Sequence, residues 1–449
     1  MLALAVPVVA AELGWVAMGT VDTMMVGRVS AEAIGAVSLG TALFLAVAIF
    51  GMGLLLGLDT LVSQAFGAGR IDDCHRCFFQ GVYLSLALAP VLMLVVYLLV
   101  HMLGAWGTDP EVAALTVPYV EKVTWSLLPL LLYASFRRYL QAMGLVQPVM
   151  FVLITANVVN AIVNWLLIFG NWGAPTLGVV GAGWATFISR SYMAGGLFLY
   201  ILYNDHRRRT GLFSVSFAFD PSRMRELLTL GFPAAAQITL ELGVFAVATA
   251  LAGRLDSVSL AAHQIALTAA SITFMVPLGV SSAGAVRVGQ ALGRGEPRAA
   301  GQAGWMALIL GAGFMALSAL CFLSFRSQIL RAFTSDEAVL TAGVSLLFVA
   351  AFFQLFDGIQ VVATGILRGA GDTRTPMLSN LVGHWFLGLP IGVTLCFILD
   401  WGVVGLWIGL SIGLIGVGIV LLFVWTRRVR YLNRSSAHMD LGGSAGPSA

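Results

Sequence analysis

Long apolar runs separated by short polar intervals set the pattern of this chain. A helix that crosses about 30 Å of hydrocarbon needs about 20 apolar residues, and twelve runs reach that length. The runs are uniformly apolar and do not alternate every second residue, so they predict helices rather than the strands of a membrane barrel. The predicted spans are 3–27, 36–63, 76–103, 113–139, 147–170, 177–203, 227–252, 260–286, 299–325, 338–366, 377–399 and 402–426.

Composition agrees with this pattern. Hydrophobic residues make up 59% of the chain and charged residues 10%, whereas soluble domains have about 25% charged residues. A soluble globular protein is therefore excluded, and the intervals between runs are too short for a separate soluble domain. We expect the first run to be retained in the membrane, since no basic region and no cleavage motif precede it.

Arginine and lysine predict the orientation. With a cytoplasmic N-terminus, eighteen of the 24 basic residues fall in inner loops or the tail, and four fall in outer loops (Arg28, Arg254, Arg326 and Arg331). This bias predicts a multi-pass protein of the plasma (inner) membrane with both termini in the cytoplasm. The net charge of +3 follows from this topology and does not indicate a nucleic-acid partner.

The chain also contains an internal repeat. An offset of 226 residues aligns VSQAFGAGR (62–70) with VGQALGRGE (288–296), and LAVPVVAA (4–11) with LGFPAAAQ (230–237). Two six-helix halves in parallel orientation are typical of transporters that bind substrate between the halves. We therefore predict an N-terminal lobe (1–203), a cytoplasmic linker (204–226), a C-terminal lobe (227–427) and a disordered cytoplasmic tail (428–449).

Three carboxylates lie inside predicted spans: Asp22, Glu241 and Asp357. A charge at bilayer depth costs at least a few kcal/mol, so such residues usually mark a substrate or ion pathway. A buried acid can hold a proton and release it when a cation arrives. Glu12 and Asp59 lie near predicted cytoplasmic ends, where we expect them to reach the lipid headgroups.

Amides and hydroxyls accompany these acids at helical spacing. Gln354, Gln360 and Thr364 share a face with Asp357, and Gln237 lies one turn before Glu241. Asn157, Asn160 and Asn164 form a similar stripe in the fifth span. Such residues also serve simply as hydrogen-bonding contacts between membrane helices, which stays an alternative for each of them.

These features together resemble the multidrug and toxic compound extrusion (MATE) family, in its NorM-like branch. The resemblance runs from LAVPVVAAELGWVAMGTVDTMMVG (4–27) through FQLFDGIQVVATGILRGAGDTRTP (353–376). It implies an all-α protein of twelve transmembrane helices in two lobes, which exports amphipathic organic cations and drugs in exchange for sodium ions or protons.

The resemblance also implies roles for individual residues. Asp22, Asn160, Asn164 and Thr186 match the N-terminal-lobe site for cation or proton coupling, where sodium is a candidate ligand. Glu241 and Asp357 match the C-terminal-lobe carboxylates, and Gln237, Gln354 and Gln360 join them as candidate substrate-binding residues. Some relatives have an acid at the position of Asn164, so this chain carries one charge fewer there.

Other functions fit the sequence less well. A flippase for lipid-linked oligosaccharide would need basic residues along the spans, which offer few apart from Arg190. A membrane enzyme would need a cluster of His, Cys or Ser at one depth, and no Walker A motif is present. We expect no enzyme activity and no cofactor, and a monomer. Arg190 is expected either to pair with an acid or to lie in the outer half, and His384 to form a hydrogen bond between helices or to relay protons.

Overall fold

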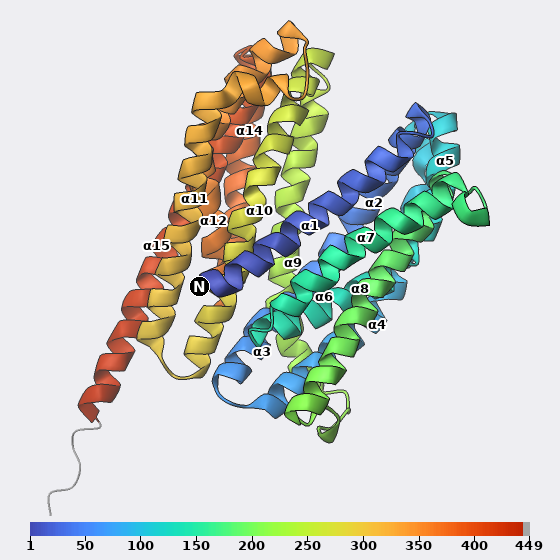
Figure 1. Ribbon diagram of the computed structural model, residues 1–449. Coiled ribbons are helices and arrows are strands. Elements are labelled where there is room, and N and C mark those ends of the chain that lie inside the picture. The colour runs from blue at the N-terminus through green and yellow to red at the C-terminus, as the bar shows by residue number, and fades with distance from the viewer. Residues whose placement is uncertain (443–449) are drawn as a thin grey trace, which may run out of the picture. The chain divides into compact units, whose positions relative to one another are not determined.

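The computed structural model describes the backbone of residues 1–442 and the side chains of residues 1–434. These residues form helices and no strand, from α1 (Leu2–Val26) to α15 (Gly402–Gly442), as Figure 1 shows. Ten helical segments within the described residues are long and apolar enough to cross a membrane. The predicted all-α polytopic fold is therefore confirmed, while the full count of twelve spans is not.

The other two predicted spans are not among these long apolar helices, and each has a physical reason. Residues 113–139 are divided between two short helices at Trp125 and Ser126, and residues 177–203 lie in a helix that contains Arg190. The helices between α1 and α15 are α2 (Ala31–Leu54), α3 (Gly57–Gly67), α4 (Ile71–His101), α5 (Pro110–Thr124), α6 (Leu127–Ala142), α7 (Gln147–Phe169), α8 (Val179–Arg208), α9 (Pro221–Ala252), α10 (Ser257–Gly293), α11 (Pro297–Arg331), α12 (Glu337–Gly369), α13 (Arg374–Asn380) and α14 (Leu389–Val393), with π-helical turns η4 (Leu381–Gly388) and η5 (Thr394–Ile398).

Packing divides the chain into two units. The N-terminal unit is Ala10–Ala235, and the C-terminal unit combines Met1–Val9 with the chain from Ala236 onward. In the first, α7 packs on α8 and α4 on α6; in the second, α10, α11 and α12 pack on one another and α15 packs on α12. These boundaries differ from the predicted lobes, because residues 204–235 pack with the N-terminal unit. Helix α15 extends to Gly442, and the rest of the predicted disordered tail (443–449) lies outside the described residues.

The internal repeat reappears as matching contacts in the two units. A Cβ atom on Gly53 would lie 2.5 Å from the Cα of Ala235, and one on Gly279 would lie 2.9 Å from the Cα of Val9. Both residues of one contact lie 226 positions from those of the other. The helix caps Ser30 and Asp256 match in the same way. Close helix approach at small residues thus recurs at equivalent positions in both halves.

Glu12 and Asp59 do not reach the headgroups as predicted. Glu12 on α1 forms a buried ion pair with Arg137 on α6, and Asp59 on α3 pairs with Arg138 at 3.3 Å. The prediction was wrong because each acid has a basic partner more than 75 residues away in the sequence. Both pairs hold neighbouring helices of the N-terminal unit together.

Breaking one of these pairs should destabilise the protein. Glu12→Gln leaves the Arg137 guanidinium buried without its counter-charge, which costs about 3 kcal/mol in comparable cases. We expect a clear drop in the thermal unfolding midpoint of the purified protein in detergent. The double variant Glu12→Gln/Arg137→Met, which removes both charges, should recover part of that loss. An unchanged midpoint for Glu12→Gln alone would contradict the assigned role of the pair.

Candidate functional site

The N-terminal unit contains a carboxylate held by amides. Asp22 lies near the end of α1, and its Oδ1 accepts a hydrogen bond from Asn164 Nδ2 on α7 at 2.5 Å. Asn164 also donates to the Oδ1 of Asn160, one turn earlier, at 3.1 Å. Both asparagines are fully buried. The structure therefore brings together three of the four residues assigned to this site from the sequence.

Thr186 and Asn157, the other polar side chains near this cluster, donate to backbone carbonyl oxygens. Thr186 on α8 is buried and donates to the carbonyl oxygen of Ala182 at 3.0 Å, with no hydrogen bond to the acid. Asn157 bonds the backbone of α1 through the carbonyl oxygen of Gly14 at 3.1 Å. The Oδ1 atom of Asn164 has no hydrogen-bond partner among the described residues. One acceptor beside the carboxylate is thus available to a ligand.

Arg190 is buried in α8, one turn after Thr186. Its Nη1 donates to the hydroxyl of Ser126 at 2.6 Å, and its guanidinium lies 4.5 Å from the ring centroid of Phe44. It forms no ion pair with any residue whose side chain the structure describes, although it interacts electrostatically with Asp22. Neither alternative predicted for Arg190 included this environment of aromatic rings and one hydroxyl. Its buried positive charge is balanced through space by the acid of the same unit.

The C-terminal unit contains a second amide-bound carboxylate. Glu241 on α9 accepts hydrogen bonds from Gln237 Nε2 at 2.7 Å and from Gln360 Nε2 on α12 at 3.1 Å. Gln360 also donates to the Oδ1 of Asn380 on α13 at 3.4 Å. The chain of amides connects three helices around one acid. Asn380 is a member that sequence spacing did not reveal, since it lies in another predicted span.

Asp357 is buried on α12, one turn before Gln360. It has no hydrogen bond or ion pair among the residues whose side chains are described, and it interacts electrostatically with Glu241. Two negative charges in one water-poor site repel each other, so the pair favours a bound cation or proton. Gln354 points elsewhere: it donates to the hydroxyl of Thr273 on α10 at 2.9 Å. It therefore shares the helix face of Asp357 without joining the hydrogen bonds of Glu241.

His384 does not form the hydrogen bond between helices that was one of its two predicted roles. It is buried in the π-helical turn η4, and neither ring nitrogen has a hydrogen-bond partner among the described residues. The expected hydrogen bond between helices is therefore wrong. His263, which the sequence analysis did not single out, makes such a bond: Trp407 Nε1 donates to its Nδ1 at 2.9 Å, and Thr249 Oγ1 lies 2.9 Å from its Nε2.

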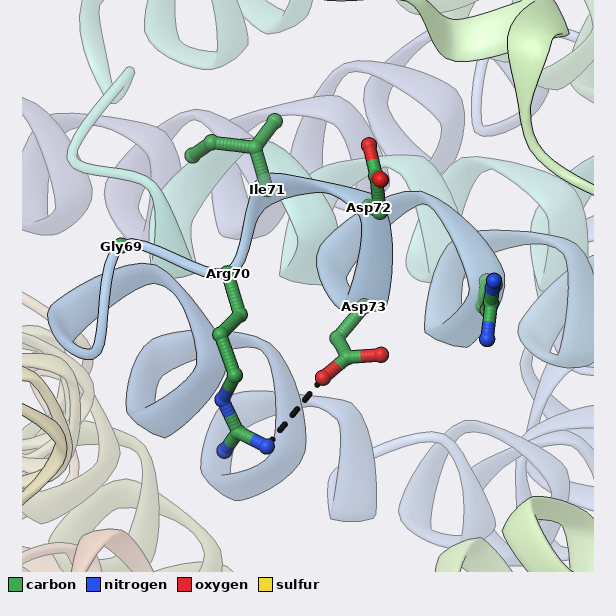
Figure 2. A pocket seen from close by; sticks show the side chains of 6 residues that line it. Gly69, Arg70, Ile71, Asp72 and Asp73 are labelled. Atoms are coloured by element: carbon green, nitrogen blue, oxygen red, sulfur yellow. Dashed lines mark ion pairs between the residues drawn. The ribbon is translucent and has the colours of Figure 1, made fainter.

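A surface pocket lies in the N-terminal unit. Figure 2 shows it at the turn between α3 and α4, where Arg70 and Asp73 form an ion pair of 3.2 Å. Gly69, Asp72 and Arg76 are among its other lining residues. None of the residues assigned to coupling or substrate binding lines this pocket.

Comparison with known proteins identifies the family of this chain. The MatE family model matches residues 7–166 and 233–394, which is most of the chain. The chain belongs to the MatE family. Within that family it is 38% identical to "Probable multidrug resistance protein NorM" of Mesorhizobium japonicum, over 96% of this chain and 93% of that protein. It is 33% identical to the multidrug resistance protein NorM of Photobacterium profundum, over 99% and 97% of the two chains.

Solved structures agree on the fold. The eukaryotic MATE transporter AtDTX14 superposes with a TM-score of 0.86 and 21% identity, and covers 97% of both chains. The family match and the NorM relatives confirm the resemblance to the MATE family and its NorM-like branch, and the chain is a multi-pass membrane protein.

Proposed function

We propose that this protein is a secondary active antiporter that exports amphipathic organic cations and drugs. NorM relatives that match nearly the whole chain are named as multidrug resistance proteins. The single observation that carries the proposal is the pair of carboxylate clusters, one around Asp22 and one around Glu241, whose hydrogen-bond donors among the described residues are neutral amides. Neutral partners do not cancel the negative charge of the acid, so that charge can attract an incoming cation or bind a proton.

We further propose that the coupling ion is a proton rather than sodium, the other candidate. Sodium needs several oxygen ligands, and Asn164 Oδ1 with the Thr186 hydroxyl would offer some of them. The carboxylate of Asp22, however, already receives the N–H of Asn164, and the positive charge of Arg190 acts on it. Sodium would have to gather several oxygen atoms around a carboxylate that already faces an N–H and a positive charge, whereas a proton needs a single carboxylate oxygen.

In this proposal the organic cation binds at the C-terminal cluster, around Glu241 and Asp357. Glu241 and Asp357 supply up to two negative charges, and Gln237 and Gln360 supply hydrogen-bonding groups around them. An organic cation with an apolar body and one positive charge fits that chemistry. Protonation of the acids would weaken the attraction for the cation and so promote its release.

Efflux from proteoliposomes tests the function and the ion separately. Purified protein is reconstituted with a fluorescent organic cation such as ethidium, and either a proton gradient or a sodium gradient at clamped pH is imposed. We expect the proton gradient to drive dye movement and the sodium gradient to leave it unchanged. Movement driven by sodium alone would overturn the ion assignment, and no movement under either gradient would overturn the antiport function.

A further inference from the structure

Residues 209–220, here called the strap, follow a fixed path across the N-terminal unit between α8 and α9. Tyr83 on α4 donates a hydrogen bond to the carbonyl oxygen of Phe217 at 2.5 Å. Gln80, one turn earlier, donates to the carbonyl oxygen of Ala218 and accepts from the backbone N–H of Asp220, both at 3.4 Å. Side chains of α4 thus hold the backbone of the strap at three successive points.

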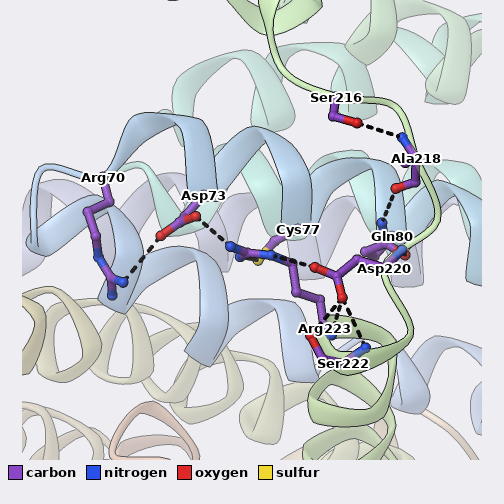
Figure 3. Close-up of polar contacts among 9 residues, drawn as sticks. All are labelled: Arg70, Asp73, Cys77, Gln80, Ser216, Ala218, Asp220, Ser222 and Arg223. Carbon is purple, nitrogen blue, oxygen red and sulfur yellow. Dashed lines mark hydrogen bonds and ion pairs between the residues drawn. The ribbon is translucent and has the colours of Figure 1, made fainter.

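The two ends of the strap are held as well. The Nε2 of His75 lies 3.1 Å from the carbonyl oxygen of Thr210, and its Nδ1 lies 2.8 Å from the hydroxyl of Tyr139. Because a carbonyl only accepts, Nε2 carries the proton that forms the first bond. At the other end, Arg223 bonds Asp73 at 2.6 Å, as Figure 3 shows. The strap is therefore part of the folded unit.

The strap nevertheless presents aromatic rings to its surroundings. Leu212 and Val215 are buried against the unit, whereas Phe213 and Phe219 are 56% and 57% exposed and Phe217 is 46% exposed. The ring of Phe217 packs edge-on against Phe79 of α4, with 4.7 Å between the ring centroids, while those of Phe213 and Phe219 are more than half exposed. Exposed apolar groups gathered on one segment mark a surface that meets a membrane or another protein.

The preceding helix points to the membrane. Leu199, Tyr203 and Arg207 are exposed and spaced by four residues on one face of α8. This order of apolar, aromatic and basic residues is typical of a helix leaving the hydrocarbon through the headgroup region. Arg208 and Arg209 extend the basic end, and both are exposed. The rings of the strap follow directly after these three positive charges.

The acids near this basic run are already engaged. Asp205 accepts from the hydroxyl of Thr210 and the N–H of Leu212, and Asp220 pairs with Arg223 at 3.2 Å. Hydrogen bonds from Ser222 and from the N–H of Arg223 lower the pKa of Asp220, so it stays ionised and keeps this pair at neutral pH. Arg207 donates one hydrogen bond to the hydroxyl of Tyr203 at 3.4 Å, which leaves its charge unpaired. Among the described residues none of the three arginines has an acidic partner, so their charges are available to an external anion.

We propose that Arg207, Arg208 and Arg209 together with the rings of the strap bind anionic phospholipid headgroups at the cytoplasmic surface of the membrane. The arginines contact the phosphates, and the phenylalanine rings insert beside them into the headgroup boundary. The lipid-facing stripe of α8 leads into this surface, which favours a lipid over a protein partner. The surface would fix the depth of the N-terminal unit in the bilayer.

Lipid selectivity of the reconstituted full-length protein tests the proposal. Spin-labelled phosphatidylglycerol and phosphatidylcholine are compared by the fraction of each that the protein immobilises. We expect a preference for phosphatidylglycerol of about threefold or more, and its loss in Arg207→Gln/Arg208→Gln/Arg209→Gln. The matched control is Arg427→Gln/Arg428→Gln/Arg430→Gln, which removes three exposed charges from α15, outside the strap, and should keep the preference.

Three outcomes would overturn the proposal. The first is equal immobilisation of the two lipids by the unaltered protein, and the second is an equal loss of preference in both triple variants. The third is loss of the preference on adding inorganic phosphate but not chloride at the same ionic strength, since it would assign the arginines to free phosphate. Retention of the preference in phosphate supports the lipid headgroup.

The depth of the rings provides an independent measurement. A spin label is placed at Phe219→Cys in a Cys321→Ser background, because Cys321 is the exposed one of the four cysteines. We expect this label to be reached by oxygen more readily than by a water-soluble nickel chelate. A label at Glu296→Cys, in an exposed turn, serves as the aqueous reference. Equal accessibility at the two positions would place the strap in water and overturn the proposal.

Discussion

Glu241→Gln should abolish coupled export while leaving the protein folded. Glutamine has the shape of glutamate, and its single amide oxygen can still accept one of the two hydrogen bonds that Gln237 and Gln360 donate to separate oxygens of Glu241. It cannot lose or gain a charge, so the exchange between proton and organic cation has no carrier at this position. We expect efflux of a fluorescent cation from proteoliposomes to fall at least about tenfold, a change of 1.4 kcal/mol or more in the driving interaction.

The matched control for this change lies on the same helix. Glu226→Gln removes a charge from an exposed position of α9, outside the predicted span, and should leave efflux unchanged. Size-exclusion profiles of both variants show whether they fold. Efflux near the level of the unaltered protein from well-folded Glu241→Gln would remove the C-terminal cluster from the mechanism.

Asp22→Asn should uncouple the protein from its driving gradient. The substitution neutralises the acid that Asn164 bonds and that balances the buried guanidinium of Arg190. Substrate binding should survive, because the acids that attract the organic cation belong to the C-terminal unit. We therefore expect dye movement that no longer responds to an imposed proton gradient, together with a dye dissociation constant within about threefold of the original, the usual size of indirect effects.

Asp72→Asn is the control for this second change. Asp72 is an exposed acid in the first turn of α4, and its loss should alter neither binding nor the response to the gradient. Gradient-driven efflux that persists in Asp22→Asn would show that the N-terminal cluster is structural. A large loss of dye binding in the same variant would instead place the substrate in the N-terminal unit.

The helices were predictable from sequence because they depend on uninterrupted apolar length. Each predicted span coincides with one helix or with adjoining helical elements in the structure, and the span 377–399 is divided among α13, η4, α14 and η5. The break at Trp125 and Ser126 was not predictable, since apolar residues continue across it. The physical reason for the break lies in contacts that only the folded structure shows. The hydroxyl of Ser126 donates to the carbonyl oxygen of Val123 and accepts a hydrogen bond from Arg190 on α8.

Partners from distant helices account for what the sequence did not reveal in the polar sites. Spacing placed Gln237 beside Glu241, because both lie on one face of one helix. Spacing could not show that Glu12 would find Arg137, or that Gln354 would bond Thr273 in another helix. A periodic stripe fixes which residues share a face, and the packing of neighbouring helices decides which of them meet.

The matching contacts of Gly53 with Ala235 and of Gly279 with Val9 bear on the origin of the chain. The opening segment of each half completes the unit formed mainly by the other half. Separate protomers that trade identical segments in this way form domain-swapped dimers. A single-copy ancestor with this packing would have assembled as a swapped homodimer. Fusion of two copies would keep the same exchange of segments within one polypeptide. Each half of the present chain therefore buries its opening segment in the unit that the other half mainly forms.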